Sequence, residues 1–226
     1  MKLTSRVDRI GESATLRVSR RAAEMRAQGV DVVDFGAGEP DFPSPPVAVE
    51  AARKALADGF TKYTPSSGIP SLRRALAERY NRTHGAPWSP AQTLITVGGK
   101  GALFEVALAL FEPGDEVVLH TPTWVSFPEQ IRFAGAEVVE VPTDDADGFT
   151  PRAAPLLAAL GPRTRAVILT SPCTPTGGVM PALDLRALVE GCARSGVVVI
   201  SDETYERFVY DGDTAASAAA LAAEFP

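Results

Sequence analysis

After Pro90, short aliphatic runs alternate with segments of helical spacing, and this alternation is the strongest constraint on the fold. The runs are nearly continuous in Val, Ile and Leu, which is typical of strands buried on both faces of a parallel sheet. We therefore predict an α/β fold: a doubly wound, mostly parallel sheet sandwiched by helices, with a helical N-terminal arm. The predicted strands are 93–97, 116–120, 137–141, 166–170 and 197–201. The predicted helices are 13–28, 46–58, 69–83, 100–111, 126–133, 152–160 and 182–194, with a further helix start in 215–223.

Composition excludes several classes of protein. The chain has 22 basic and 28 acidic side chains, a net charge of −6, which disfavours nucleic-acid binding. No apolar run approaches the ~20 residues that a membrane span needs, and residues 1–9 lack the apolar core of a secretory signal. Cys173 and Cys192 lack metal-site spacing, so we expect two free thiols. We predict a cytoplasmic protein without nucleic-acid, membrane or metal partners.

Ligands of open parallel sheets bind beyond the carboxyl ends of the strands, so the residues after each strand are candidate site residues. Gly98-Gly99-Lys100 follows one predicted strand and begins a helix, whose free N–H groups attract anions. An ordinary tight turn explains the same glycines. Trp124 follows the next strand and either stacks on a planar ligand or packs against the core.

Two further strand ends carry polar residues. Segment 171–178 combines two prolines, two glycines and three hydroxyl side chains, which predicts a rigid turn with hydroxyls available to a ligand. Asp202 ends a buried strand, where a carboxylate needs a positive partner such as a protonated heterocyclic nitrogen. Capping of a following helix is the alternative. The pair Lys62-Tyr63 lies in a polar loop of the arm and indicates no function by itself.

Together these segments resemble the fold-type I pyridoxal-phosphate enzymes, specifically the class I and II aminotransferases of the aspartate aminotransferase kind. The resemblance covers essentially the whole chain in order. Its motifs are Gly-Ala-Gly-Glu-Pro-Asp-Phe at 36–42 and the segments 62–63, 97–100, 113–117, 124–128, 171–177 and 201–206. It implies that residues 1–45 form an N-terminal arm and part of a small domain, and that residues 46–226 form a large cofactor-binding domain.

The resemblance implies pyridoxal 5′-phosphate as the cofactor and gives four residues a role around its ring. Asp202 would pair with the pyridinium nitrogen and keep it protonated. Trp124 would stack on the ring, and Tyr205 would donate a hydrogen bond to the phenolic oxygen. Thr174 takes the place of the family's asparagine at that oxygen. A hydroxyl is shorter and carries one donor instead of two, so cofactor electronics or substrate preference can differ.

Four other residues have implied roles at the phosphate and the substrate. Gly99 and Lys100 would bind the phosphate through backbone amides. Tyr63 would reach the phosphate of the partner subunit's cofactor, which implies a homodimer with shared active sites, and Gly38 would contact the substrate carboxylate. The implied reaction is transfer of an amino group between an amino acid and a 2-oxo acid.

The family's Schiff-base lysine follows the Asp202 motif, but no lysine follows Lys100 in this sequence. No catalytic residue is therefore assigned, and we predict that the 226-residue chain alone does not transaminate. The strands that follow in the family insert inside the sheet, so we expect an incomplete sheet here. Two other interpretations stay open: a lyase, racemase or cyclase of the same fold type, and a non-catalytic cofactor-binding remnant or subunit.

Overall fold

The computed structural model describes residues 2–11, 13–36, 38, 40, 42–211 and 214–225. The contacts between residues divide the chain into two compact units. We call Glu12–Ile69 the N-terminal unit, and Met1–Gly11 together with Pro70–Pro226 the sheet unit. Ala37, Glu39 and Asp41 of the motif at 36–42 lie outside the described residues.

The N-terminal unit is built on two helices, as the sequence predicts. Helix α1 (Ala14–Ala27) begins after Ser13, whose Oγ accepts a hydrogen bond from the N–H of Leu16 at 3.4 Å. Helix α2 (Pro46–Ala57) has proline at its first position, where a missing N–H costs nothing. Both helices begin and end within one residue of the predicted positions, so local capping signals were sufficient to predict their bounds.

The described residues of the sheet unit form a sheet of four strands, and all neighbouring pairs are parallel. The strands are β1 (Glu116–Thr121), β2 (Glu137–Pro142), β3 (Thr164–Thr170) and β4 (Val198–Asp202), in the order β2-β1-β3-β4. In the β3–β4 register, Thr170 lies opposite Asp202. The carboxyl ends of β1, β3 and β4 therefore meet at one edge of the sheet, which confirms the predicted parallel architecture.

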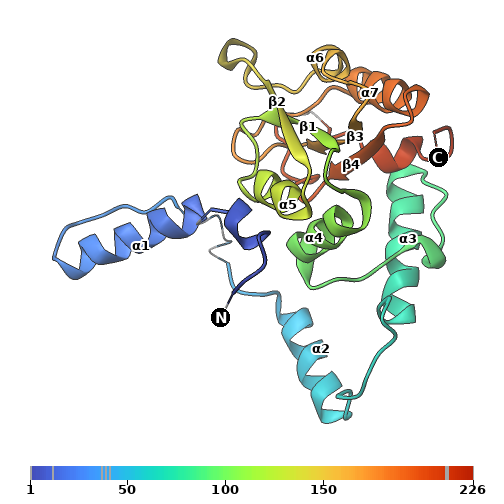
Figure 1. Cartoon of the computed structure of the whole chain (residues 1–226). Coiled ribbons are helices and arrows are strands. Elements are labelled where there is room, and N and C mark those ends of the chain that lie inside the picture. Colours follow the sequence, from blue (N-terminus) through green and yellow to red (C-terminus); the bar gives the residue numbers. More distant parts are fainter. Residues whose placement is uncertain are drawn as a thin grey trace. The chain divides into compact units, whose positions relative to one another are not determined.

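Helices cover both faces of this sheet (Figure 1). Helices α6 (Ala153–Ala158) and α7 (Ala182–Arg194) lie on one face, and α4 (Gly98–Leu110) and α5 (Ser126–Ala134) lie on the other. Alternate residues of each inner strand enter the two cores. The α6–α7 cluster contains Val118, Val167, Leu169, Leu156 and Leu188. The α4–α5 cluster contains Val117, Leu119, Ala166, Ile168, Phe127 and Ile131. This two-sided burial explains the continuous aliphatic runs.

Helix α3 (Pro70–His84) precedes α4, and short 3-10 helices complete the unit. They are η1 (Val7–Arg9), η2 (Pro90–Gln92), η3 (Asp145–Asp147) and η4 (Ala218–Leu221). The alanine-rich segment 215–223 therefore forms one short 3-10 helix. None of the described helices has the length and apolar character of a membrane span.

The strand predicted at residues 93–97 is wrong. Thr93 is extended, but within the described part of the chain no strand pairs with this segment. Its neighbour is a side chain: Arg73 Nε donates to the Thr93 carbonyl at 2.8 Å. A strand exists only where an adjacent strand satisfies its N–H and C=O groups, so β-branched composition alone is insufficient.

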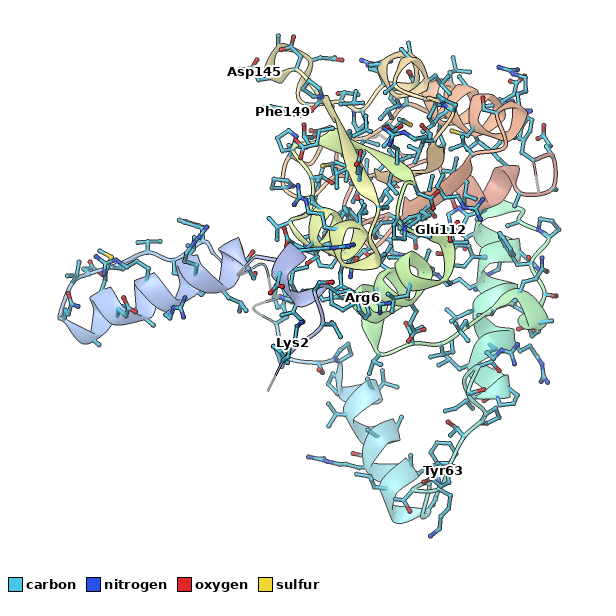
Figure 2. The ribbon with its side chains drawn as sticks, in the orientation of Figure 1. Lys2, Arg6, Tyr63, Glu112, Asp145 and Phe149 are labelled. Carbon is cyan, nitrogen blue, oxygen red and sulfur yellow. The ribbon has the colours of Figure 1, made fainter. Side chains whose placement is uncertain are left out.

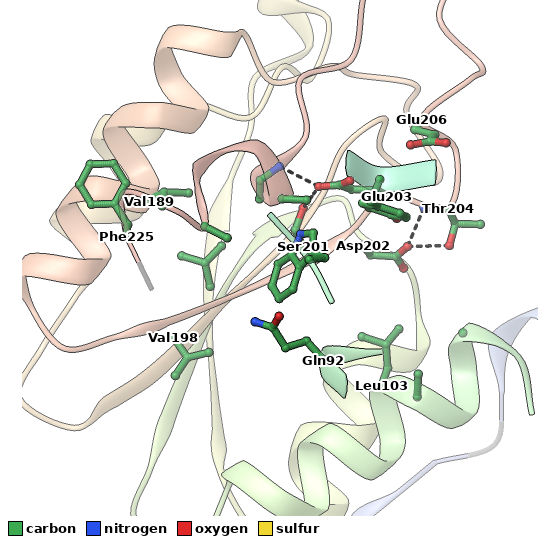
Figure 3. A pocket seen from close by; sticks show the side chains of 18 of the residues that line it. Gln92, Leu103, Val189, Val198, Ser201, Asp202, Glu203, Thr204, Glu206 and Phe225 are labelled. Carbon is green, nitrogen blue, oxygen red and sulfur yellow. Dashed lines mark hydrogen bonds between the residues drawn. The ribbon is translucent and has the colours of Figure 1, made fainter. Parts of the chain in front are cut away.

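Strand β4 forms an edge of the described sheet, next to a groove of about 1420 Å³. Figure 3 shows this groove with Val198, Gln92 and Phe225 around it. Its walls also include residues of α3, α4, α7 and η4. The described residues thus leave one side of β4 without a strand, as expected for an incomplete sheet.

Candidate functional site

Six of the predicted site residues line a single pocket of about 200 Å³ at the carboxyl edge of the sheet. They are Gly99, Lys100, Trp124, Thr174, Asp202 and Tyr205. Three residues without a predicted role complete the lining: Leu103, Thr170 and Thr204. The pocket therefore gathers residues from four segments that are distant in the sequence.

The N-terminus of α4 forms one end of the pocket. Gly98 has φ 77°, a left-handed conformation that favours glycine, and no described side chain caps the helix at Val97. Gly99 and Lys100 follow in the first turn and are exposed. Helical N–H groups in the first turn have no intrahelical acceptor and carry positive partial charge. The two sequence interpretations are thus compatible, because the tight turn itself exposes an anion-binding helix end.

Trp124 forms an aromatic wall of the pocket. Its ring packs edge-on against the buried Phe127, with the centroids 5.3 Å apart, and it extends the α4–α5 cluster. Lys100 Nζ lies 5.0 Å from the centroid of the Trp124 ring, within cation–π range. Trp124 is half-buried, so it acts as a packing residue and also lines the pocket.

Asp202 presents a carboxylate whose two oxygens differ. Oδ1 accepts hydrogen bonds from the Thr204 hydroxyl at 2.7 Å and from the Thr204 N–H at 3.1 Å (Figure 3). Among the described residues no donor reaches Oδ2, which leaves this oxygen for a positively charged ligand group. Asp202 therefore caps a turn, and the predicted alternative of a cap on a following helix is wrong.

The loop after β3 supplies one hydroxyl to the pocket. Backbone bonds from Cys173 N–H to the Gly178 carbonyl (2.9 Å) and from Gly177 N–H to the Cys173 carbonyl (2.8 Å) close it. Ser171 Oγ accepts from the Met180 N–H, and Thr176 Oγ1 accepts from the Gly178 N–H. These two hydroxyls are therefore used inside the loop, whereas Thr174 lines the pocket.

Two carboxylates hold the segment that follows Asp202. Glu203 accepts hydrogen bonds from the hydroxyls of Ser201 (2.9 Å) and Ser217 (2.6 Å), and from the Ala218 N–H (2.8 Å). Glu206 pairs with Arg79 of α3 and lies 3.2 Å from His84. The segment is thus fixed to α3 and to η4. Burial and the nearby Glu203 charge raise the pKa of the Tyr80 hydroxyl beside it.

Thr170 is a pocket residue that sequence reasoning missed. It is the last residue of β3 and only 2% exposed, and its Oγ1 has no hydrogen-bond partner among the described residues. Its N–H donates to Nε2 of the buried His120 at 3.4 Å. Burial lowers the pKa of His120, which favours the neutral ring that can accept this bond. The feature of the sequence that could have indicated Thr170 is its position, because it is the last residue of a strand, as Asp202 is.

The remaining two predicted site residues belong to the N-terminal unit and do not line this pocket. Tyr63 follows α2 and is fully exposed (Figure 2). Gly38 has open space where a side chain would be. Cys173 and Cys192 are free thiols, as predicted, and the structure shows in addition that both are buried.

Comparison with known proteins connects this geometry to one family. The protein-family model described as aminotransferase class I and II matches residues 30–226 of this chain. The aspartate/prephenate aminotransferase of Thermus thermophilus is 48% identical over 211 residues, 93% of this chain and 55% of that protein. The aspartate aminotransferase of Geobacillus stearothermophilus is 43% identical over 224 residues, 99% of this chain and 57% of that protein.

A solved structure agrees with these matches. The aspartate aminotransferase from Thermus thermophilus with maleate has a TM-score of 0.94 to this chain at 46% identity. The match covers 100% of this chain and 59% of that structure's chain. The chain thus spans about half the length of the curated relatives it matches.

Proposed function

The chain belongs to the aminotransferase class I and II family, and from this premise we propose that it forms the cofactor-binding part of a pyridoxal-phosphate-dependent transaminase. One observation carries the proposal. A single pocket joins a helix N-terminus without a cap, an aromatic wall at Trp124 and a carboxylate oxygen of Asp202 without a donor, as judged from the described residues. A planar, protonated heterocycle with a phosphate group satisfies all three features.

The residues of the pocket fit pyridoxal phosphate in a defined way. The amides of Gly99 and Lys100 would hold the phosphate, because they lie in the first turn of α4. Trp124 would cover the ring, and Asp202 Oδ2 would accept the pyridinium N–H. When bound, the cofactor supplies an electron sink for reactions at the α-carbon of an amino acid.

Thr174 and Tyr205 line the same pocket, and their hydroxyls would contact the phenolic oxygen of the ring. Thr204 is a positioning residue, because its hydroxyl and its N–H both bind Asp202 Oδ1. The combined effect of these two Thr204 hydrogen bonds would be to orient Asp202 Oδ2 toward the ring nitrogen. The negative charge of Asp202 would then stabilise the protonated form of that nitrogen.

We extend the proposal to the whole protein: transfer of an amino group between an amino acid and a 2-oxo acid. Relatives named for aspartate make a dicarboxylic amino acid the first substrate to test. Because these relatives are named aminotransferases, transamination is preferred to a lyase, racemase or cyclase reaction. The contact of Gly38 with the substrate carboxylate belongs to the same proposal.

A shared-site homodimer is part of this proposal, with Tyr63 reaching the partner subunit's cofactor. Full exposure of Tyr63 is compatible with such a contact. We also retain the division into an arm with part of a small domain (1–45) and a large cofactor-binding domain (46–226). Buried free thiols suit a reducing cytoplasm.

A binding measurement tests the cofactor assignment. Pyridoxamine 5′-phosphate is the suitable probe, because it has no aldehyde that could react with the four lysines. In a Trp88→Phe background, Trp124 is the sole tryptophan, and we expect its fluorescence to be quenched on titration. Asp202→Asn should weaken binding about tenfold to hundredfold, as expected for loss of a charged hydrogen bond.

Asp145→Asn is the matched control, since Asp145 lies in η3 and not in the pocket. It should bind the probe as the parent chain does. Absence of quenching in the parent chain, or equal loss in both aspartate variants, would contradict the assignment.

We propose that the 226-residue chain does not transaminate by itself, because no lysine follows Lys100 within it. The ammonium of Lys100 lies over Trp124 and belongs to the α4 end of the pocket. Incubation of the purified chain with aspartate and 2-oxoglutarate should therefore yield no glutamate. Measurable turnover that Lys100→Gln abolishes would show that Lys100 performs the missing role and would refute this proposal.

A further inference from the structure

Two buried side-chain atoms of the described residues have no hydrogen-bond partner: Thr170 Oγ1 and His120 Nδ1. Thr170 is 2% exposed, so water does not compensate its hydroxyl at the protein surface. Buried hydroxyls are nearly always paired, because the loss of hydration is otherwise uncompensated. Thr170 also lines the pocket, and its Oγ1 is itself buried, so the pocket is the side from which a partner would approach this atom.

The strand register gives the direction in which Thr170 projects. Ala166 and Ile168, which precede it at alternate positions of β3, belong to the α4–α5 cluster. Side chains two residues apart on a strand share a face, so Thr170 projects toward the face covered by α4. Its register partner Asp202 lies on the adjacent strand β4. The two side chains therefore lie next to each other at the carboxyl edge of the sheet.

His120 holds the backbone of Thr170 from the neighbouring strand β1. Its Nε2 accepts the Thr170 N–H at 3.4 Å, and the ring is 1% exposed. Because Nε2 is an acceptor, the neutral ring carries its proton on Nδ1. This contact occupies the N–H of Thr170 and leaves its hydroxyl for another partner.

We propose that Thr170 is a further cofactor-binding residue, whose hydroxyl forms a hydrogen bond to a polar group on the ring that Asp202 holds. This inference rests on the proposed function. Neither Thr170 nor its support by His120 was indicated by the sequence motifs. The competing explanation is a purely structural hydroxyl that stays unpaired with or without ligand.

The isosteric change Thr170→Val separates the two explanations, because they differ in the ligand-bound state. Removal of an unpaired buried hydroxyl should raise the melting temperature of the cofactor-free chain. If the hydroxyl binds the ring, the same variant should bind pyridoxamine 5′-phosphate about three- to tenfold more weakly. Affinity for inorganic phosphate, which needs only the α4 end of the pocket, should not change.

Two further variants complete the experiment. Thr170→Ser keeps the hydroxyl and should bind the probe within about twofold of the parent chain. Thr143→Val is the matched control, since the Thr143 hydroxyl donates to the Thr121 carbonyl at 2.9 Å and does not line the pocket. It should leave probe affinity unchanged. Thr170→Ala replaces the valine variant if that variant does not fold.

The outcomes distinguish this inference from the proposed function. Parent-like affinity of the valine or alanine variant, together with weak binding by Asp202→Asn, overturns only the role of Thr170. Absence of probe binding by the parent chain overturns both. Equal weakening of ring and phosphate binding also overturns the inference, since it indicates general distortion of the pocket.

Discussion

Acidification should destabilise this chain through His120 below about pH 6.5. Burial lowers the pKa of His120 below its usual value of 6.5, so the unfolded chain takes up this proton first. The free energy of unfolding therefore falls as the pH drops below about 6.5, and it stops falling at the folded-state pKa. Above that range the neutral ring contributes no pH dependence.

The size of the effect follows from proton linkage. A difference of one bound proton between the folded and unfolded states corresponds to about 1.4 kcal/mol per pH unit. Burial is the largest cause of the lowered pKa of His120, and backbone contacts with Thr170 and Pro122 oppose it in part. A proton on Nε2 would also remove the acceptor of the Thr170 N–H. At pH 6.5, where half of the unfolded chains carry the proton, the slope is about half of this limit, and it increases toward the limit at lower pH as long as the folded ring stays neutral.

Urea unfolding at a series of pH values from about 8 to about 5 measures this slope. His120→Leu should unfold with a shallower pH dependence, whatever its stability at neutral pH. His84→Gln is the matched control because His84, the other histidine, lies beside the Glu206 carboxylate. It should retain the slope below pH 6.5 that is due to His120. Parallel pH profiles for the parent chain and His120→Leu would refute the reasoning.

Three other predictions concern packing and reactivity. Leu188→Ala removes a fully buried side chain of α7 and should lower the free energy of unfolding in urea by about 2–5 kcal/mol. Leu183 is exposed on the same helix, so Leu183→Ala should lower it by less than about 0.5 kcal/mol, and similar losses for the two variants would contradict the assigned core. Gly178→Ala places a Cβ about 2.5 Å from the Phe149 carbonyl oxygen and should lower the free energy of unfolding by about 1–3 kcal/mol. An unchanged urea midpoint would show that the loop accommodates the Cβ without loss of stability. Burial raises the pKa of the Cys192 thiol to about 11, so iodoacetamide at about pH 8 should not modify this thiol until urea unfolds the chain. Mass spectrometry measures the modification, and rapid labelling of Cys192 in the folded chain would contradict the prediction.

Much of the fold could be predicted because its signals are local. The helix at 182–194 and the capped helices of the N-terminal unit follow from spacing, proline and glycine within a few residues. Continuous aliphatic runs indicated burial on two faces, and the sheet is parallel. The pocket is also largely predictable, since strand ends of a parallel sheet meet at one edge.

The predictions that failed concern residues whose bonding partners are distant in the sequence. The segment 93–97 has strand-like composition, but strand formation depends on a neighbour that the described residues do not provide. Of the hydroxyls after β3, Ser171 and Thr176 bind backbone groups of their own loop, and only the folded loop shows this. Composition cannot separate a hydroxyl that serves a loop from one that serves a ligand.

The amino-acid sequence by itself therefore determined the order of helices and strands, the parallel sheet and the residues that follow each strand. Only the tertiary structure decided which of their atoms are available. Strand register brings Thr170 beside Asp202, and the contacts of Thr204 and His120 leave Asp202 Oδ2 and the Thr170 hydroxyl without partners in the described part of the chain. Propensity and capping act over a few residues, whereas the pairing of a buried polar atom depends on every segment that packs around it.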